Sequence, residues 1–324
     1  MTFWTVLLFL LGFACLIFGG NWFVDAATGL ARRMRMSEIV IGATIVSIGT
    51  TLPEVMVSST SAVMGHGEIA YGNAVGSIIC NAALIAALTI TIRPSNVSRK
   101  SILVPAISFF VSAAVFCASA YWLGGFPRWI GIILLLILVL HMFLTLYRAK
   151  KEPEQPQEET AEPDKKPSPL WRDILFLIVG AALIAVGARL LVDNGTVIAQ
   201  SAGVPESVIA LTMVALGTSL PELVTAIVAL IKGHSALSLG NIIGANILNI
   251  VFVTGLSATI SPFSVPSEKM LFGQNASLVL DLPLMLALML ILTLPAIIKQ
   301  KLYRTQGIVM LVAYVAFCTF QFVF

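Results

Sequence analysis

Charged residues are scarce in this chain. Only 11% of its 324 residues are Asp, Glu, Lys or Arg, whereas 58% are hydrophobic, and the mean hydropathy is +0.97. A soluble domain carries about 25% charged residues, because polar groups must cover its surface. The low charge therefore excludes a cytosolic enzyme or a partner of nucleic acid, and it predicts a polytopic membrane protein surrounded by the lipid bilayer.

Cysteine and histidine are also sparse and scattered. The four cysteines lie singly within apolar stretches, with no CxxC pair and no histidine nearby, so neither a disulfide framework nor a zinc site is expected. The three histidines fall outside the polar motifs described below, which argues against an intramembrane hydrolase. The sequence therefore predicts no enzyme activity, no cofactor and no obligate protein partner.

Long apolar runs dominate what is present. A helix needs about 20 mostly apolar residues to cross the hydrocarbon core of a bilayer. The sequence holds ten such runs, which predicts an all-α protein with ten transmembrane helices. The predicted spans are 3–25, 38–64, 69–92, 101–123, 127–147, 173–200, 204–231, 236–260, 277–298 and 306–323.

Basic residues are distributed unevenly between the predicted loops. One set of alternate loops holds 16 of the 19 Lys and Arg residues, and the opposite set holds only Arg128 and Lys269. Because cytoplasmic loops are enriched in these residues, we expect a protein of the cell (inner) membrane with both termini extracytoplasmic. The loop 149–171 is then cytoplasmic, and its many proline and acidic residues predict a flexible linker.

The sequence contains an internal repeat. Shifted by 168 positions, residues 37–94 match residues 205–262 at 21 of 58 positions, and ten of the matches fall on Gly, Pro, Asn or Glu, compared with four on the abundant Leu and Val. The predicted halves, 1–148 and 172–324, contain five spans each. Because five is an odd number, the second half begins on the opposite side of the membrane and is inverted relative to the first. Inverted repeats are characteristic of secondary transporters, whose substrate site lies near the membrane midplane.

The strongest matches form one polar hexapeptide in each half, GTTLPE at 49–54 and GTSLPE at 217–222. Glu54 and Glu222 lie deep within apolar spans, where a charge is costly unless it faces a partner or a cavity. Neither span contains Lys or Arg, so a bound cation is the expected counter-charge. Pro53 cannot donate to the carbonyl four residues earlier, so each motif offers a hydroxyl, a freed carbonyl and a carboxylate.

The spans that follow supply a second polar wall. They carry GNAVGS at 72–77, followed by Asn81, and GNIIGA at 240–245, followed by Asn249. The Gly-xxx-Gly spacing lets helix backbones approach closely. Together the two halves offer two carboxylates and several neutral oxygens, in the range of about six to eight that calcium takes. A packing motif is the alternative, but two inverted copies with an intramembrane carboxylate each favour a cation site.

At these residues the chain resembles the sodium/calcium exchanger family, within the wider cation/calcium antiporters, and is similar to its short prokaryotic calcium/sodium antiporters. The resemblance is most specific at 42–81 and 210–249, the two alpha-repeat motifs of the family. It implies that spans one and six slide against a fixed core and that a central group of four positions holds Ca²⁺ or Na⁺. The ligands that it implies are Ser47 (backbone), Thr50, Thr51, Glu54, Ser77, Asn81, Ala215 (backbone), Thr218, Ser219, Glu222 and Asn249.

Two positions depart from the pattern of sodium-coupled members, which often have Ser at the position of Ala245 and Asp at that of Asn249. With Asn at both 81 and 249, the formal charge of the site cannot exceed two negatives, which one calcium ion or two sodium ions neutralise. Together with this resemblance, the sequence predicts a secondary active antiporter that exchanges Ca²⁺ for Na⁺ by alternating access. An exchanger coupled to H⁺ or K⁺ is the alternative; a cation channel is less favoured, because the polarity is concentrated at one depth.

Other ionisable residues are assigned no part in this site. Asp25 and Asp193 occupy matching positions of the repeat near the ends of spans one and six, where they could line an ion entrance or simply be solvated. Arg189 precedes Asp193 by four residues and is expected to pair with it within the helix. His66 and His234 follow spans two and seven and are expected to be turn residues.

Overall fold

The protein folds into a helical bundle, as predicted. The computed structural model describes residues 3–151, 169–203, 217–267, 270–271 and 273–323. Its α-helices are α1 Phe3–Met34, α2 Glu38–Ile41, α3 Ser47–Val63, α4 Gly67–Cys80, α5 Ala87–Ile92, α6 Arg99–Ala118, α7 Arg128–Lys151, α8 Leu170–Ser201, α11 Leu220–Ile231, α12 Ser235–Leu248, α13 Gly255–Ile260, α14 Leu282–Ile298 and α15 Arg304–Val323. Its π-helical segments are η1 Gly42–Val46, η2 Asn81–Ala86, η3 Ser119–Leu123, η6 Asn249–Thr254 and η7 Ser277–Asp281. Its short strands, β1 Gly125–Phe126 with β2 Phe263–Ser264 and β3 Met270–Leu271 with β4 Gln274–Asn275, pair antiparallel.

Eight helices among the described residues are long and apolar enough to cross a membrane. They are Phe3–Met34, Glu38–Val63, Gly67–Ile92, Arg99–Leu123, Arg128–Lys151, Leu170–Ser201, Ser235–Ile260 and Ser277–Ile298. These bounds lie within a few residues of the predicted spans, with one exception. The first helix continues past residue 25 to Met34, because Ala26, Ala27 and Leu30 are buried and extend its packed face.

The count of ten helices stays a prediction, as do the boundaries of the two halves and of the linker. Most of the linker, the start of the predicted span 204–231 and the predicted ligand Ala215 lie outside the described residues.

The internal repeat is visible in the fold. The series α4, η2, α5 and the series α12, η6, α13 have identical lengths and begin 168 residues apart, at Gly67 and Ser235. The two halves also exchange partners, since α5 of the first half packs on α15 of the second and α13 of the second packs on α7 of the first. Such reciprocal contacts are expected when two copies are related by a two-fold pseudo-symmetry, as in transporters built from inverted repeats.

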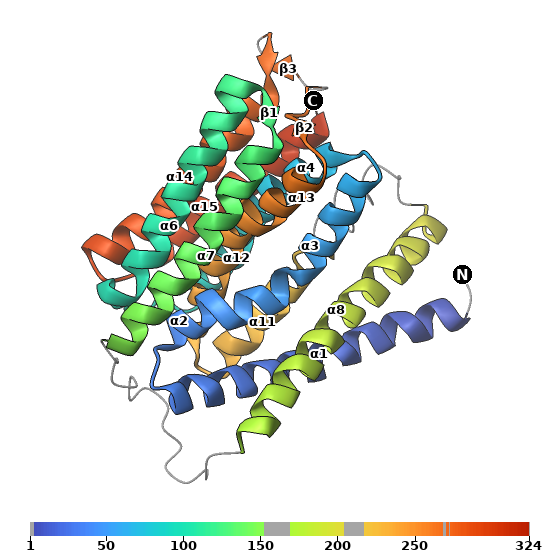
Figure 1. Ribbon diagram of the computed structural model, residues 1–324. Coiled ribbons are helices and arrows are strands. Elements are labelled where there is room, and N and C mark those ends of the chain that lie inside the picture. The colour runs from blue at the N-terminus through green and yellow to red at the C-terminus, as the bar shows by residue number, and fades with distance from the viewer. Residues whose placement is uncertain (1–2, 152–168, 204–216, 268–269, 272, 324) are drawn as a thin grey trace.

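Helices α1 and α8 form a separate pair along one edge of the bundle, as Figure 1 shows. Glycines let the two backbones touch: a Cβ atom on Gly19 would lie 3.0 Å from the carbonyl oxygen of Gly180, and one on Gly180 would lie 2.8 Å from the amide nitrogen of Phe23. Gly12 and Gly187 repeat this contact nearer the start of α1. Close approach through small residues is typical of helix pairs in membranes.

We expect Gly180→Leu to destabilise the protein by about 1–3 kcal/mol, the usual cost of overfilling a packed interface. Thermal unfolding of the purified protein in detergent should show a lower midpoint. Ala182→Leu is the matched control, because Ala182 is exposed on the same helix and a larger side chain there meets lipid. Equal midpoints for the two variants would contradict the close α1–α8 contact.

The largest apolar core lies on the other side of the bundle and includes residues of α4, α5, α6, α12 and α14. The rings of Tyr71, Phe116 and Phe126 pack against one another within it, with centroids 4.6–6.0 Å apart. Helices α3 and α11, which carry the two hexapeptides, contact both α12 of this core and the α1–α8 pair. The hexapeptides therefore lie between a packed core and a peripheral helix pair.

Candidate cation-binding site

The two glutamates of the repeated motif are completely buried. Glu54 lies within α3 and Glu222 in the first turn of α11, and both have 0% of their surface exposed. Helix α3 contacts α11, and Thr51 of α3 reaches Glu222, so both carboxylates lie in the same region of the interior. Two like charges in a medium of low dielectric constant repel strongly. The pair therefore needs a cation or protons to neutralise it.

Hydroxyl groups of the first motif reach across to the second half of the chain. Thr51 Oγ1 donates to Glu222 Oε1 at 3.4 Å, and Thr50 Oγ1 donates to Asn241 Oδ1 at 3.1 Å. These bonds join α3 to α11 and to α12. Polar groups that are far apart in sequence thus converge at one place in the interior.

Several oxygen atoms at this place have no hydrogen-bond partner among the described residues. They include both carboxylate oxygens of Glu54, one of Glu222, the side-chain oxygens of Asn81 and Asn249, and Ser219 Oγ. Buried polar atoms are nearly always paired, so each exception needs an explanation. Carboxylate, amide and hydroxyl oxygens are the ligands that hard cations such as calcium prefer. The unpaired set therefore fits a passing metal ion as substrate.

The two asparagines occupy equivalent and unusual positions. Asn81 is the first residue of η2, and Asn249 is the first residue of η6. Thr254 Oγ1 donates to the backbone oxygen of Asn249 at 3.2 Å, within the looser backbone of η6. Isolated π-helical segments are frequent at functional sites. Hydropathy could not reveal them, because both segments have the composition of an ordinary apolar helix.

Proline has different consequences in the two halves. Pro53 lies inside α3, which continues as an α-helix from Ser47 to Val63, and the π-helical segment η1 precedes it. Pro221 instead lies in the first turn of α11, after a turn that contains Ser219. A proline is favoured in that first turn, where its missing N–H has no partner to lose.

The remaining predicted ligands of the first half line the same interior region. Ser47 is buried, its Oγ donates to the carbonyl of Thr44 at 3.0 Å, and its own carbonyl accepts from Thr50 Oγ1 at 3.3 Å. Ser77 is buried and contacts Asn73 at 3.5 Å. In the second half, Thr218 is half-buried in the turn before α11.

Two asparagines near the site were not among the predicted ligands. Asn241 holds the Thr50 hydroxyl, and Asn73 donates to the backbone oxygen of Glu54 at 3.4 Å and to Ser58 Oγ at 2.9 Å. Both belong to the Gly-Asn pairs that match between the halves. The match between the halves could have drawn attention to both asparagines. Their hydrogen-bond partners, however, depend on how the helices cross and cannot be read from the sequence.

Four of the other ionisable residues, Asp25, Arg189, Asp193 and His234, have partners outside this site. Arg189 Nε lies 3.5 Å from Asp193 Oδ2, which confirms their predicted pairing. His234 Nδ1 lies 2.7 Å from Glu38 Oε1, a contact between α12 and α2. Asp25 is paired with a lysine of α11, as described below.

Comparisons with known proteins identify the family of this chain. The sequence profile of the sodium/calcium exchanger protein family matches residues 4–147 and 173–323. The chain belongs to the sodium/calcium exchanger family. The putative antiporter CaxA of Alkalimonas amylolytica is 32% identical to it and covers 95% of each chain. The sodium/calcium exchanger MaX1 of Methanosarcina acetivorans is 29% identical and covers 98% of each chain.

Further similarities agree with this family. The inner membrane protein YrbG of Escherichia coli is 35% identical and covers 87% of each chain. Among solved structures, the sodium-calcium exchanger NCX_Mj, soaked with 10 mM Na⁺ and no Ca²⁺, matches with a TM-score of 0.78 and 31% identity over 98% of each chain. As a member of this family, the chain is a multi-pass membrane transporter that exchanges Ca²⁺ against another cation.

Proposed function

We propose that this exchanger moves Ca²⁺ in one direction and Na⁺ in the other through one shared site, by alternating access. The observation that carries the proposal is the pair of fully buried glutamates, one from each half, whose oxygen atoms are largely unpaired. The Na⁺ and Ca²⁺ named for MaX1 and NCX_Mj support the choice of ions.

In this proposal the transport of Ca²⁺ is coupled to that of Na⁺ because the two ions cannot occupy the site at the same time. Calcium binds between Glu54 and Glu222, and sodium ions use the same oxygens after calcium leaves. An empty site holds two buried negative charges, and moving it through a region of low dielectric constant is costly. A loaded site is nearly neutral and can change its exposure. This difference prevents leak and enforces exchange.

Neutral oxygens complete the proposed site. The residues that we assign to it besides the two glutamates are Ser47, Thr50, Thr51, Ser77, Asn81, Ala215, Thr218, Ser219 and Asn249, with Ser47 and Ala215 acting through their carbonyls. The α1–α8 pair is the part that we propose to slide, since α1 and α8 contact each other closely through glycines and both lie at the edge of the bundle.

Two buried positions limit the charge that the site can carry. Ala245 places a methyl group at the position that corresponds to Ser77 in the first half, and Asn249 offers a neutral amide. Two glutamates alone balance one Ca²⁺ or two Na⁺. We therefore propose an exchange of two sodium ions for one calcium ion without net charge movement.

We further propose a location in the cell (inner) membrane with both termini extracytoplasmic and the 149–171 loop cytoplasmic. The excess of Lys and Arg in one set of loops supports this orientation, and the similarity to the inner membrane protein YrbG supports the location. In the cell membrane, an inward sodium gradient would drive calcium out of the cell through such an exchanger.

Calcium flux in proteoliposomes tests this function. Vesicles with purified protein are loaded with Na⁺, with K⁺ or with choline at an imposed pH gradient, and Ca²⁺ uptake is followed after dilution. We expect uptake only with internal Na⁺. Uptake driven by internal K⁺ or by the pH gradient alone would show that K⁺ or H⁺ is the coupling ion instead of Na⁺. Equal uptake into vesicles that hold only choline, without a pH gradient, would contradict exchange.

A further inference from the structure

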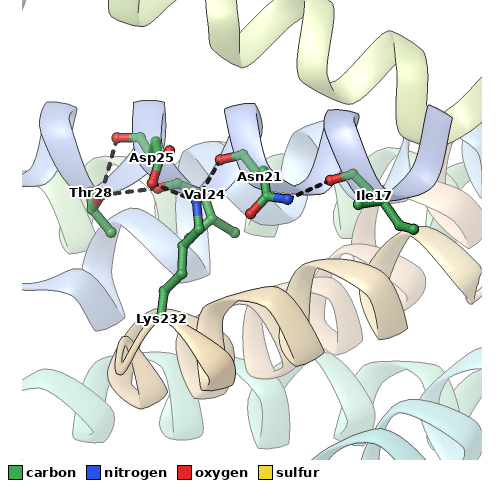
Figure 2. A network of polar contacts seen from close by, with 6 residues as sticks. All are labelled: Ile17, Asn21, Val24, Asp25, Thr28 and Lys232. Atoms are coloured by element: carbon green, nitrogen blue, oxygen red, sulfur yellow. Dashed lines mark hydrogen bonds and ion pairs between the residues drawn. The ribbon is translucent and has the colours of Figure 1, made fainter. Parts of the chain in front are cut away.

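An ion pair connects the peripheral pair to the core at one end of α11. Lys232 caps α11, and its Nζ lies 2.7 Å from Asp25 Oδ1 and 3.1 Å from the backbone oxygen of Asn21, both on α1 (Figure 2). Asp25 is the only acidic residue within Phe3–Met34. An axial shift of α1 by one turn, about 5.4 Å, would therefore leave Lys232 without a carboxylate from α1.

The equivalent position in the first half carries no charge. Met64 caps α3 with backbone angles φ −78° and ψ 0°, and Lys232 caps α11 with φ −79° and ψ −1°. Each is followed by a glycine with positive φ, Gly65 at 86° and Gly233 at 85°. Helix α8 packs on α3 as α1 packs on α11. The same local structure thus ends in lysine on one side and methionine on the other.

The equivalent aspartate also has a different kind of partner. Asp193 of α8 matches Asp25 of α1 in the repeat, and their side chains are 64% and 63% exposed. Asp193 pairs with Arg189 of its own helix, at the position that matches Asn21. The partner of Asp193 would move with α8, whereas the partner of Asp25 lies at the end of α11, outside the α1–α8 pair.

We propose that Lys232 and Asp25 position α1 so that the exchanger rests in the conformation of this structure, and that this makes its apparent ion affinity unequal on the two membrane faces. The inference rests on the proposed sliding of the α1–α8 pair. Two inverted copies alone would give end states of similar energy, and a contact that only one state can form breaks this balance. A ligand that binds only the other conformation has a weaker apparent affinity, because only a fraction of the molecules adopts that conformation.

The test compares the Ca²⁺ concentration that half-saturates exchange at each face, in vesicles of uniform orientation. Lys232→Met makes the two helix ends alike, and we expect it to change the ratio of the two concentrations by about two- to fivefold, as for an exposed ion pair. Asp25→Asn should act in the same way. Met64→Lys offers Asp193 an equivalent partner and should change the ratio in the opposite direction.

Matched variants separate positioning from general damage. Asp193→Asn should leave the ratio unchanged, because its partner is in the same helix. Exchanging the charges, with Asp25→Lys and Lys232→Asp together, should restore the wild-type ratio. An unchanged ratio in Lys232→Met, or affinities that fall equally on both faces, would overturn the inference while exchange itself remains. Wild-type vesicles that show no exchange would overturn the proposed function and this inference together.

Discussion

Glu222→Gln is expected to abolish calcium uptake into sodium-loaded vesicles, and Glu54→Gln is expected to do the same. Each change removes one of two fully buried negative charges, so that bound Ca²⁺ would keep one positive charge without a partner. Removing one partner from a buried charge pair costs about 2–5 kcal/mol, so Ca²⁺ affinity should fall at least about 30-fold. Uptake at low Ca²⁺ concentrations would then drop to the level of empty vesicles.

The matched control for these variants is Glu68→Gln, which removes an exposed carboxylate from the first turn of α4. Its uptake should equal that of the wild type. Thermal unfolding with and without Ca²⁺ distinguishes loss of binding from misfolding: the two site variants should unfold cooperatively but lose the shift that Ca²⁺ gives to the wild type. Near-normal uptake in both site variants would rule out the shared site between Glu54 and Glu222.

Hydropathy and the repeat predict much of the fold, because lipid forces helices to be long and apolar. Hydropathy and the repeat do not predict features of the fold that depend on side-chain packing. The first helix was predicted to end near Asp25, since a charge interrupts the apolar run, yet Ala27 and Ala31 bury the next turns. The segment Gly42–Val46 has the composition of an ordinary helix, so its π-helical backbone was not predicted.

The two charged residues of the candidate site were predicted from the sequence, but some of the hydrogen bonds around them were not. Depth in an apolar span predicts that Glu54 and Glu222 are buried, because a solvated charge cannot lie there. The bond between Thr50 and Asn241 depends on how α3 crosses α12, which sequence spacing does not encode. The pairing of Lys232 with Asp25, 207 residues apart, depends in the same way on the contact of α11 with α1.

The double variant Ala245→Ser/Asn249→Asp is expected to make the exchange electrogenic. Asn249 is fully buried at the start of η6, and an aspartate there would give the site a third negative charge. The serine hydroxyl would supply one more sodium ligand. Three sodium ions would then neutralise the site, whereas one calcium ion would leave one negative charge, so each cycle would move one net charge across the membrane.

Membrane voltage reveals this change. One charge per cycle is worth about 2.3 kcal/mol per 100 mV, so an inside-positive potential of about 100 mV should raise the final Ca²⁺ accumulation of sodium-loaded vesicles about 50-fold. The wild type should not respond, because two sodium ions balance one calcium ion. Ala245→Ser alone adds the ligand without the charge and should stay unresponsive, as should Asn194→Asp, which adds a charge on α8. A voltage response in the wild type would instead show that two glutamates do not set the stoichiometry.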